Sequence, residues 1–97
     1  MLNIKVRNQL RGLAHDLKPV VSVGKKGHTE TLSREILSAL LAHELIKVQF
    51  QKSAVDTSEE IANLLCQELG AELVEMRGHV ATIYKAHPEK PRIRIMH

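Results

Sequence analysis

The spacing of the apolar residues changes repeatedly along the chain, and this alternation limits the folds that it can adopt. Apolar side chains recur every three or four residues over residues 3–15, 29–43 and 57–69, which is the repeat of a helix with one buried face. Short apolar runs, rich in β-branched residues, lie between and after these segments, as is typical of buried strands. The order helix-strand-helix-strand-helix-strand-strand predicts an α/β fold with helices packed on a sheet.

Four segments are predicted to be strands, and their connections determine the kind of sheet. They cover residues 20–23, 45–50, 71–76 and 80–84. Strands that a helix separates pair in parallel, whereas the last two, which a short turn joins, form an antiparallel hairpin. Because 97 residues have room for one core, we expect a single two-layer domain with a four-stranded mixed sheet.

Several residues are of the types that begin or end helices. Pro19 disfavours helical geometry in the residue before it and so ends the first helix. Thr29 is the expected N-cap of the second helix. Thr57 and Glu60 have the spacing of a capping box at the start of the third helix, and Gly70 is expected to end it.

The first helix is predicted to carry two neighbouring stripes, one apolar and one basic. The apolar stripe, which is expected to face the core, consists of Val6, Leu10, Leu13, Ala14 and Leu17. The basic stripe consists of Arg7, Arg11 and His15. Such a helix packs on one side and offers positive charge beside it.

The net charge of +3 conceals an uneven distribution along the chain. Residues 1–29 hold six Lys and Arg against one acid, for a net charge of +5, and residues 85–97 hold four against one, for +3. Residues 30–84 hold four against nine, for −5. This arrangement indicates a basic surface directed at a polyanion. A charged surface that only keeps the domain in solution explains the charges equally well.

One short motif, Gly24-Lys25-Lys26-Gly27, stands between the first strand and the second helix. Glycines let the backbone approach a ligand closely, and the start of a helix offers N–H groups and positive potential to a phosphate. Two lysines add charge that suits such a contact. In KH domains a GXXG loop clamps the backbone of a single strand, although it joins two helices there. The spacing does not fit a nucleotide-binding P-loop, and a plain tight turn with exposed lysines is the other interpretation.

The chain lacks the residues that several other classes of function need. Aromatic residues make up 2% of the chain, which excludes an RNA-binding sheet built on several stacking rings. Cys66 is the single cysteine, so an internal disulfide and a cysteine-based zinc site are excluded. The histidines have no metal-ligand spacing, and no nucleophile has a base and an orienting partner nearby. We therefore expect neither an enzyme nor a protein with a metal or cofactor.

The chain carries no signal for a membrane or for export. No apolar run approaches the length that spans a bilayer, and residues 1–11 lack the apolar centre of a signal peptide. A single cysteine suits a reducing compartment. We expect a cytoplasmic protein.

Four groups of residues, in this order along the chain, resemble the CRM domain. They are Ala14-His15-Asp16-Leu17-Lys18-Pro19-Val20-Val21 followed by Val23, then Gly24-Lys25-Lys26-Gly27, then His43-Glu44-Leu45-Ile46-Lys47-Val48, and Gly78-His79 with Ile83-Tyr84-Lys85. The resemblance covers about residues 3–86 and is strongest to the bacterial YhbY-type proteins, which consist of a single CRM domain. It implies a fold related to the C-terminal domain of bacterial translation initiation factor three.

The resemblance also implies RNA binding, in bacteria to precursors of the large ribosomal subunit. Residues 1–86 would form the RNA-binding domain. Residues 87–97 lie outside the shared pattern, and their two prolines and weak packing signals predict a basic, flexible tail. His28 stands where the family pattern usually has an apolar residue, and it is expected to extend the polar surface. The predicted RNA-binding residues are Gly24, Lys25, Lys26, Gly27, His28, Arg7, Arg11 and Lys18.

The predicted partner is ribosomal RNA in those precursors, bound by a monomer without a membrane or a small-molecule substrate. The alternative is a protein-interaction module of the translation machinery. In that case the acidic residues 30–84 dock a partner, and the basic ends only keep the chain in solution. A strong salt dependence of RNA binding distinguishes the first hypothesis from the second.

Overall fold

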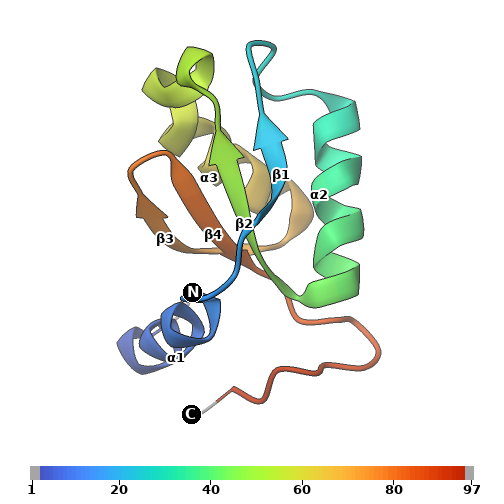
Figure 1. Ribbon diagram of the computed structural model, residues 1–97. Coiled ribbons are helices and arrows are strands. Elements are labelled where there is room, and N and C mark those ends of the chain that lie inside the picture. The colour runs from blue at the N-terminus through green and yellow to red at the C-terminus, as the bar shows by residue number, and fades with distance from the viewer. Residues whose placement is uncertain (1–2, 96–97) are drawn as a thin grey trace.

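The computed structural model describes residues 3–95, and its elements follow one another in the predicted order (Figure 1). The helices are α1 (Ile4–Ala14), α2 (Glu30–His43) and α3 (Ser58–Leu69). The strands are β1 (Pro19–Val23), β2 (Leu45–Phe50), β3 (Glu72–Arg77) and β4 (Val80–Tyr84). A short 3₁₀ helix, η1 (Lys52–Thr57), precedes α3 and is not predicted by the sequence pattern. Within the described residues, none of the helices is long and apolar enough to cross a membrane.

The four strands form one mixed sheet, as predicted, in the order β1-β2-β4-β3. β1 pairs with β2 in parallel, while β2 with β4 and β4 with β3 form antiparallel pairs. β1 is therefore an edge strand. Its C-terminal end leads directly into the Gly-Lys-Lys-Gly loop at one end of the molecule (Figure 1).

Helices α2 and α3 pack on one face of the sheet and form the larger core. Its centre consists of side chains with almost no exposed surface, namely Ile36, Leu40, Ile46, Val48, Phe50, Leu65 and Ile83. Burial of each such side chain contributes about 1.5–3 kcal/mol to stability. This core joins helices to a sheet in the two layers that the alternation of elements predicts.

Helix α1 lies against the opposite face of the sheet and buries a smaller cluster (Figure 1). The cluster consists of Val6, Leu10, Ala14, Leu45, Val74 and Tyr84. The neighbours Leu45 and Ile46 belong to different clusters because successive side chains of a strand point to opposite faces. Helix α1 thus adds a partial third layer over one end of the sheet.

The buried stripe of α1 is narrower than predicted. Val6, Leu10 and Ala14 are buried, whereas Leu13 is 51% exposed and Leu17 is 39% exposed. The prediction that Leu13 and Leu17 face the core was wrong. The helix ends at Ala14, before Leu17, and it covers only part of the sheet, so its flank stays open.

Two predicted helix boundaries are confirmed in detail, and a third is wrong in its chemistry. The hydroxyl oxygen of Thr29 accepts a hydrogen bond from the N–H of Leu32 at 3.0 Å, and Gly70 ends α3 with a φ of 67°. Thr57 precedes α3, but its side chain makes no capping bond and donates to the carbonyl of Ala54 at 3.5 Å. Because η1 runs directly into α3, Thr57 lacks the extended backbone that a capping box needs.

Glu44, the residue after α2, is fully buried and holds the segment that follows β4. Its carboxylate accepts hydrogen bonds from the backbone N–H groups of His87 at 2.8 Å, Arg92 at 2.6 Å and Ile93 at 2.9 Å. Burial alone would raise the pKa of Glu44, but these three donors and the charge of Arg92 bring the pKa below its ordinary value.

The segment after β4 packs more closely than its composition suggests. Ile93 and Ile95 contact the cluster beneath α1, and the side-chain amide of Gln9 donates to the carbonyl of Arg94 at 2.6 Å. The segment therefore has specific contacts with α1 and with the end of α2, which the sequence pattern does not predict.

Candidate nucleic-acid interface

The Gly-Lys-Lys-Gly loop forms a tight turn between β1 and α2 (Figure 1). The N–H of Gly27 donates to the carbonyl of Gly24 at 3.0 Å, which closes the turn. Lys25 and Lys26 occupy its tip, and both are exposed. The turn therefore projects two positive charges into solvent at one end of the domain.

Both glycines of the loop have close neighbours. Gly27 has a φ of 63°, and a Cβ there would lie 3.3 Å from Cδ1 of Ile61 in α3. A Cβ on Gly24 would lie 3.3 Å from Oε1 of Gln51, the residue after β2. The backbone N–H of Gln51 donates to the carbonyl of Val23 at 2.8 Å. The loop is thus held between the end of β2 and α3.

A shallow hollow of about 440 Å³ lies beside the loop, between the end of β1 and the first turns of α2. It is lined by residues 24–27 of the loop and by Thr29, Thr31 and Glu35, among others. The first N–H groups of a helix have no partner within it and lie at the positive end of its dipole. Together with the two lysines they suit a phosphate group, with the Glu35 carboxylate as the opposing charge.

His28, between the loop and the N-cap of α2, contacts α3. Its Nε2 lies 2.6 Å from Oε2 of Glu68 and 3.3 Å from the hydroxyl of Ser33. The hydrogen bond with His28 is the main reason that the pKa of Glu68 is below its ordinary value, and the bond with Ser33 adds to it. The imidazole of His28 therefore joins the start of α2 to the last turns of α3.

The other predicted RNA-binding residues lie at the opposite end of β1. Lys18 directly precedes β1 and is exposed, while Arg7 and Arg11 belong to α1. A strand of this length separates Lys18 from the loop by roughly 16 Å. The structure thus divides the predicted residues into a loop group and an α1 group instead of bringing them together at one point.

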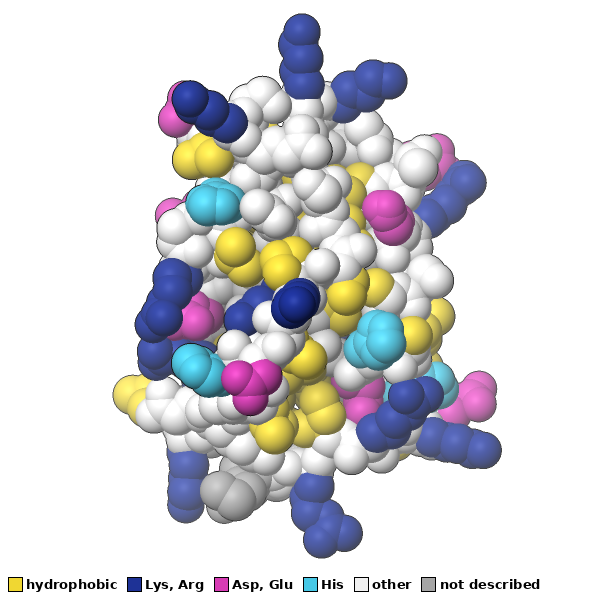
Figure 2. Space-filling view, in the orientation of Figure 1, with side chains coloured by type: hydrophobic (Ala, Val, Ile, Leu, Met, Phe, Trp, Pro, Cys, Tyr) yellow, Lys and Arg dark blue, Asp and Glu magenta, His cyan; other side chains and the backbone are white. Residues whose placement is uncertain are grey.

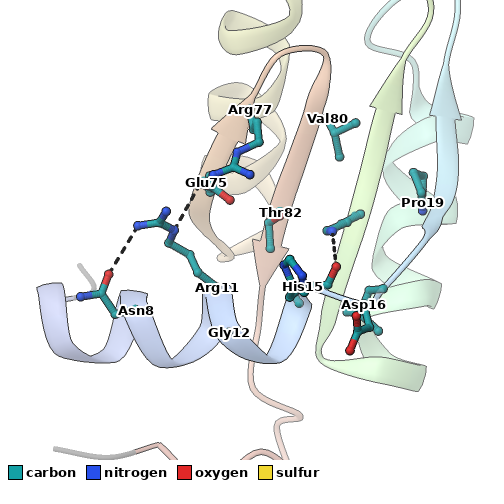
Figure 3. Close-up of a pocket in the computed structure, with 13 residues that line it drawn as sticks. Asn8, Arg11, Gly12, His15, Asp16, Pro19, Glu75, Arg77, Val80 and Thr82 are labelled. Atoms are coloured by element: carbon teal, nitrogen blue, oxygen red, sulfur yellow. Dashed lines mark hydrogen bonds and ion pairs between the residues drawn. The ribbon is translucent and has the colours of Figure 1, made fainter.

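Of the α1 group, only Arg11 lines a larger hollow of about 660 Å³ between α1 and the uncovered part of the sheet, which we call the sheet-face hollow (Figure 3). Arg11 Nε and Arg77 Nη2 both approach Oε1 of Glu75, at 3.1 Å and 3.7 Å. The Nζ of Lys47 donates to the carbonyl of His15 at 3.5 Å. The polar side chains that line the hollow are Asn8, Arg11, His15, Asp16, Lys47, Glu75, Arg77 and Thr82.

Lys47 and Arg77 are cations of this region that the sequence reasoning missed. Lys47 interrupts the apolar strand Leu45–Phe50, and the two-residue period of a strand places it on the face opposite Ile46 and Val48. The strand period could therefore have predicted the position of Lys47. The position of Arg77 could not be predicted, because only the strand order brings β3 beside α1.

The described residues hold neither a metal-ligand cluster nor a reactive thiol. Within residues 3–95, no group of three or more His, Cys, Asp or Glu side chains is arranged to hold a metal ion. Cys66 is a free, buried cysteine of α3, and burial together with the charge of Glu72 raises the pKa of its thiol to about 11. The thiol is therefore protonated at neutral pH and is a poor nucleophile.

The fold and the two basic regions define a class of protein. It is a small α/β domain with a glycine-lysine loop at the start of a helix and a polar, cationic sheet face. The chain belongs to the CRM family, because residues 2–85 match the CRS1 / YhbY (CRM) domain. This match spans nearly the whole chain and confirms the family indicated by the four sequence motifs.

Proteins of similar sequence occur in other organisms. An RNA-binding protein of Haemophilus influenzae is 40% identical over 88 residues, which cover 91% of this chain and 89% of that one. The probable RNA-binding protein YqeI of Bacillus subtilis is 33% identical over 95 residues, or 98% of this chain and 99% of that one. The solution structure of a Staphylococcus aureus protein matches with a TM-score of 0.82 at 33% identity, covering 99% of this chain and 100% of that one. The match to a solved structure confirms the predicted fold.

Proposed function

We propose that this protein binds RNA through the Gly-Lys-Lys-Gly loop and acts without catalysis. The observation that carries the proposal is the geometry of the loop. Two exposed lysines stand at the tip of a closed turn, directly before the first N–H groups of α2. Two relatives support it, since the one from Haemophilus influenzae is named an RNA-binding protein and the one from Bacillus subtilis a probable RNA-binding protein.

The loop has the means to hold a sugar-phosphate backbone. Lys25 and Lys26 contact phosphate oxygens, and the start of α2 offers further N–H donors. Because Gly24 and Gly27 carry no side chain, the RNA backbone can approach the protein backbone closely. Contacts of this kind carry no base information, so the protein recognises the backbone and shape of a folded RNA.

The proposal also extends to the RNA partner, the oligomeric state and the location of the protein in the cell. We assign the partner to ribosomal RNA in precursors of the large subunit, as the resemblance to CRM proteins implies. We also expect the protein to be a monomer and to act in the cytoplasm. Arg7, Arg11, Lys18 and His28 complete the proposed RNA-binding residues. A sucrose gradient of a cell extract tests this assignment, because the protein should sediment with precursors of the large subunit. Its confinement to ribosome-free fractions would contradict the assembly role.

A charge-matched pair of variants tests the loop. Lys25→Gln/Lys26→Gln should weaken the binding of unrelated RNA sequences alike. It should also flatten the slope of log affinity against log salt by about 1.4, for two lost phosphate contacts on single-stranded RNA. Lys5→Gln/Lys90→Gln removes the same charge from exposed positions in α1 and after β4. Equal losses in both variants, or none in a folded loop variant, would reject the loop as the site.

A further inference from the structure

The face of the sheet opposite α2 and α3 is covered at one end only. Helix α1 covers the end formed by Leu45, Val74 and Tyr84, and the rest of the face is open (Figure 2). The register of the strands aligns the side chains of this face in two rows across the sheet, in which Thr82 alone is buried, at 3% exposed. The first row is Pro19, Lys47, Thr82 and Glu75, and the second, nearer the loop, is Ser22, Gln49, Val80 and Arg77. Six of these eight side chains are polar, and the apolar Pro19 and Val80 lie among them, so the face presents hydrogen-bonding groups between hydrophobic ones (Figure 2).

Positive charge gathers where the first row meets α1. Arg11 and Arg77 share a single carboxylate oxygen of Glu75, at 3.1 Å and 3.7 Å, so one acid orients two guanidinium groups toward the hollow (Figure 3). Each guanidinium has five N–H donors, and donors remain for a further anion. Lys47 adds a third cation, against the carboxylates of Glu75 and Asp16. The sheet-face hollow therefore keeps a net positive charge.

A line of polar side chains connects the hollow with the loop. Gln49 and Gln51 follow Lys47 at the two-residue period of a strand, and Gln51 Nε2 donates to the hydroxyl of Ser22 at 3.2 Å. The side chain of Gln51 also lies directly against Gly24, the first residue of the loop. From Lys47 to Gln51 the strand advances by roughly 13 Å. An extended polyanion of a few units can therefore reach both the hollow and the loop.

We propose that the sheet-face hollow is a second contact for the sugar-phosphate backbone of the RNA that the loop holds, with Lys47 and Arg77 as its phosphate ligands. This inference rests on the RNA binding proposed above. A cationic face rich in donors matches phosphate and ribose hydroxyl groups. The two aromatic residues, Phe50 and Tyr84, are 1% and 7% exposed, so the face offers no ring on which a base could stack. A protein partner would need an apolar centre that these rows do not supply.

The test compares two lengths of single-stranded RNA. One RNA has about four nucleotides, the length that a GXXG loop clamps, and the other has about 16. Lys47→Gln/Arg77→Gln should weaken binding of the long RNA roughly tenfold and leave the short RNA unchanged, because only the long RNA reaches the hollow. Lys25→Gln/Lys26→Gln should weaken both. Lys5→Gln/Lys90→Gln, with the same loss of charge, serves as the control, and thermal unfolding verifies that each variant is folded.

The outcomes separate the two proposals. The hollow would be overturned, and the loop left intact, if Lys47→Gln/Arg77→Gln bound the long RNA as tightly as the wild type does. The same holds if it bound the long RNA as tightly as the control variant does. A wild type that binds neither RNA would overturn RNA binding itself. As a measurement independent of mutation, the amide NMR signals of Gln49 and Thr82 should shift when the long RNA is added. Unmoved signals at saturation would count against the hollow.

Discussion

Arg92 donates its backbone N–H to Oε1 of Glu44 at 2.6 Å, which joins the end of α2 to a residue 48 positions further along the chain. The side chain of Arg92 strengthens the connection, since its Nη1 donates to the carbonyl of Ala42 at 2.7 Å. A cation at the C-terminus of a helix also interacts favourably with the helix dipole. Glu44 and Arg92 thus hold the segment after β4 against the end of α2.

Glu44→Gln should lower the free energy of unfolding by about 2 kcal/mol at neutral pH, because a neutral amide replaces a buried charged acceptor of three N–H donors. Urea denaturation measures the loss. Hydrogen exchange should quicken at the amides of Arg92 and Ile93 more than at Val48 in the core. Uniform quickening at all three amides would contradict a local role for Glu44.

The stability lost in Glu44→Gln is expected to depend on pH. Because the pKa of Glu44 is lowered in the folded protein, its contribution to stability is complete above the ordinary value of 4.5 and is lost as the pH falls through the folded pKa. The difference in stability between the wild type and Glu44→Gln should therefore shrink in acid. Glu30→Gln, at an exposed site, serves as the control and should change stability little at any pH. A difference for Glu44→Gln that is constant from neutral to strongly acidic pH would refute the prediction.

The loop glycine Gly27 is expected to tolerate alanine less well than Gly78 does. Both have positive φ, 63° and 59°, so alanine at either position should cost about 1 kcal/mol in backbone strain. Only at Gly27 does a Cβ meet a neighbour, Cδ1 of Ile61 at 3.3 Å. Thermal unfolding of Gly27→Ala and Gly78→Ala measures the extra cost of that contact. Equal losses would mean that Ile61 moves aside freely.

Cys66 is expected to resist modification in the folded protein. Its side chain is 7% exposed, and its raised pKa of about 11 leaves almost no thiolate at pH 8. Labelling by a thiol-specific disulfide reagent should therefore be slow in buffer and should accelerate with urea in parallel with unfolding. The urea-unfolded protein gives the reference rate. Rapid, complete labelling in buffer would contradict the buried position.

Much of the fold was predictable because local sequence patterns indicate where the helices and strands lie. The helical and strand periods locate all three α-helices and all four strands within a few residues, and Thr29 and Gly70 mark two helix ends. Thr57 shows the limit of this approach. Its spacing to Glu60 is that of a capping box, but the 3₁₀ turn before it determines the backbone conformation.

The features that depend on distant contacts were not predictable. No local pattern shows that α1 crosses to the other face of the sheet, so Leu13 and Leu17 were wrongly expected to be buried. The role of Glu44 depends on backbone donors more than 40 residues away. The sheet-face hollow combines side chains from α1, β2, β3 and β4, which only the strand order brings together. The loop differs, because its chemistry lies within four adjacent residues.

Helix α1 is made before every surface on which it packs. Val6 and Leu10 meet Val74 and Tyr84, and the cluster is completed by Ile93 near the other end of the described chain. During synthesis from the N-terminus, α1 therefore cannot bury its apolar stripe until most of the chain has been made. We expect docking of α1 and of the segment after β4 to be a late, shared step of folding, since loops that long close slowly. The same two parts should be the first to separate in partial unfolding, leaving the sheet with α2 and α3 as the persistent unit.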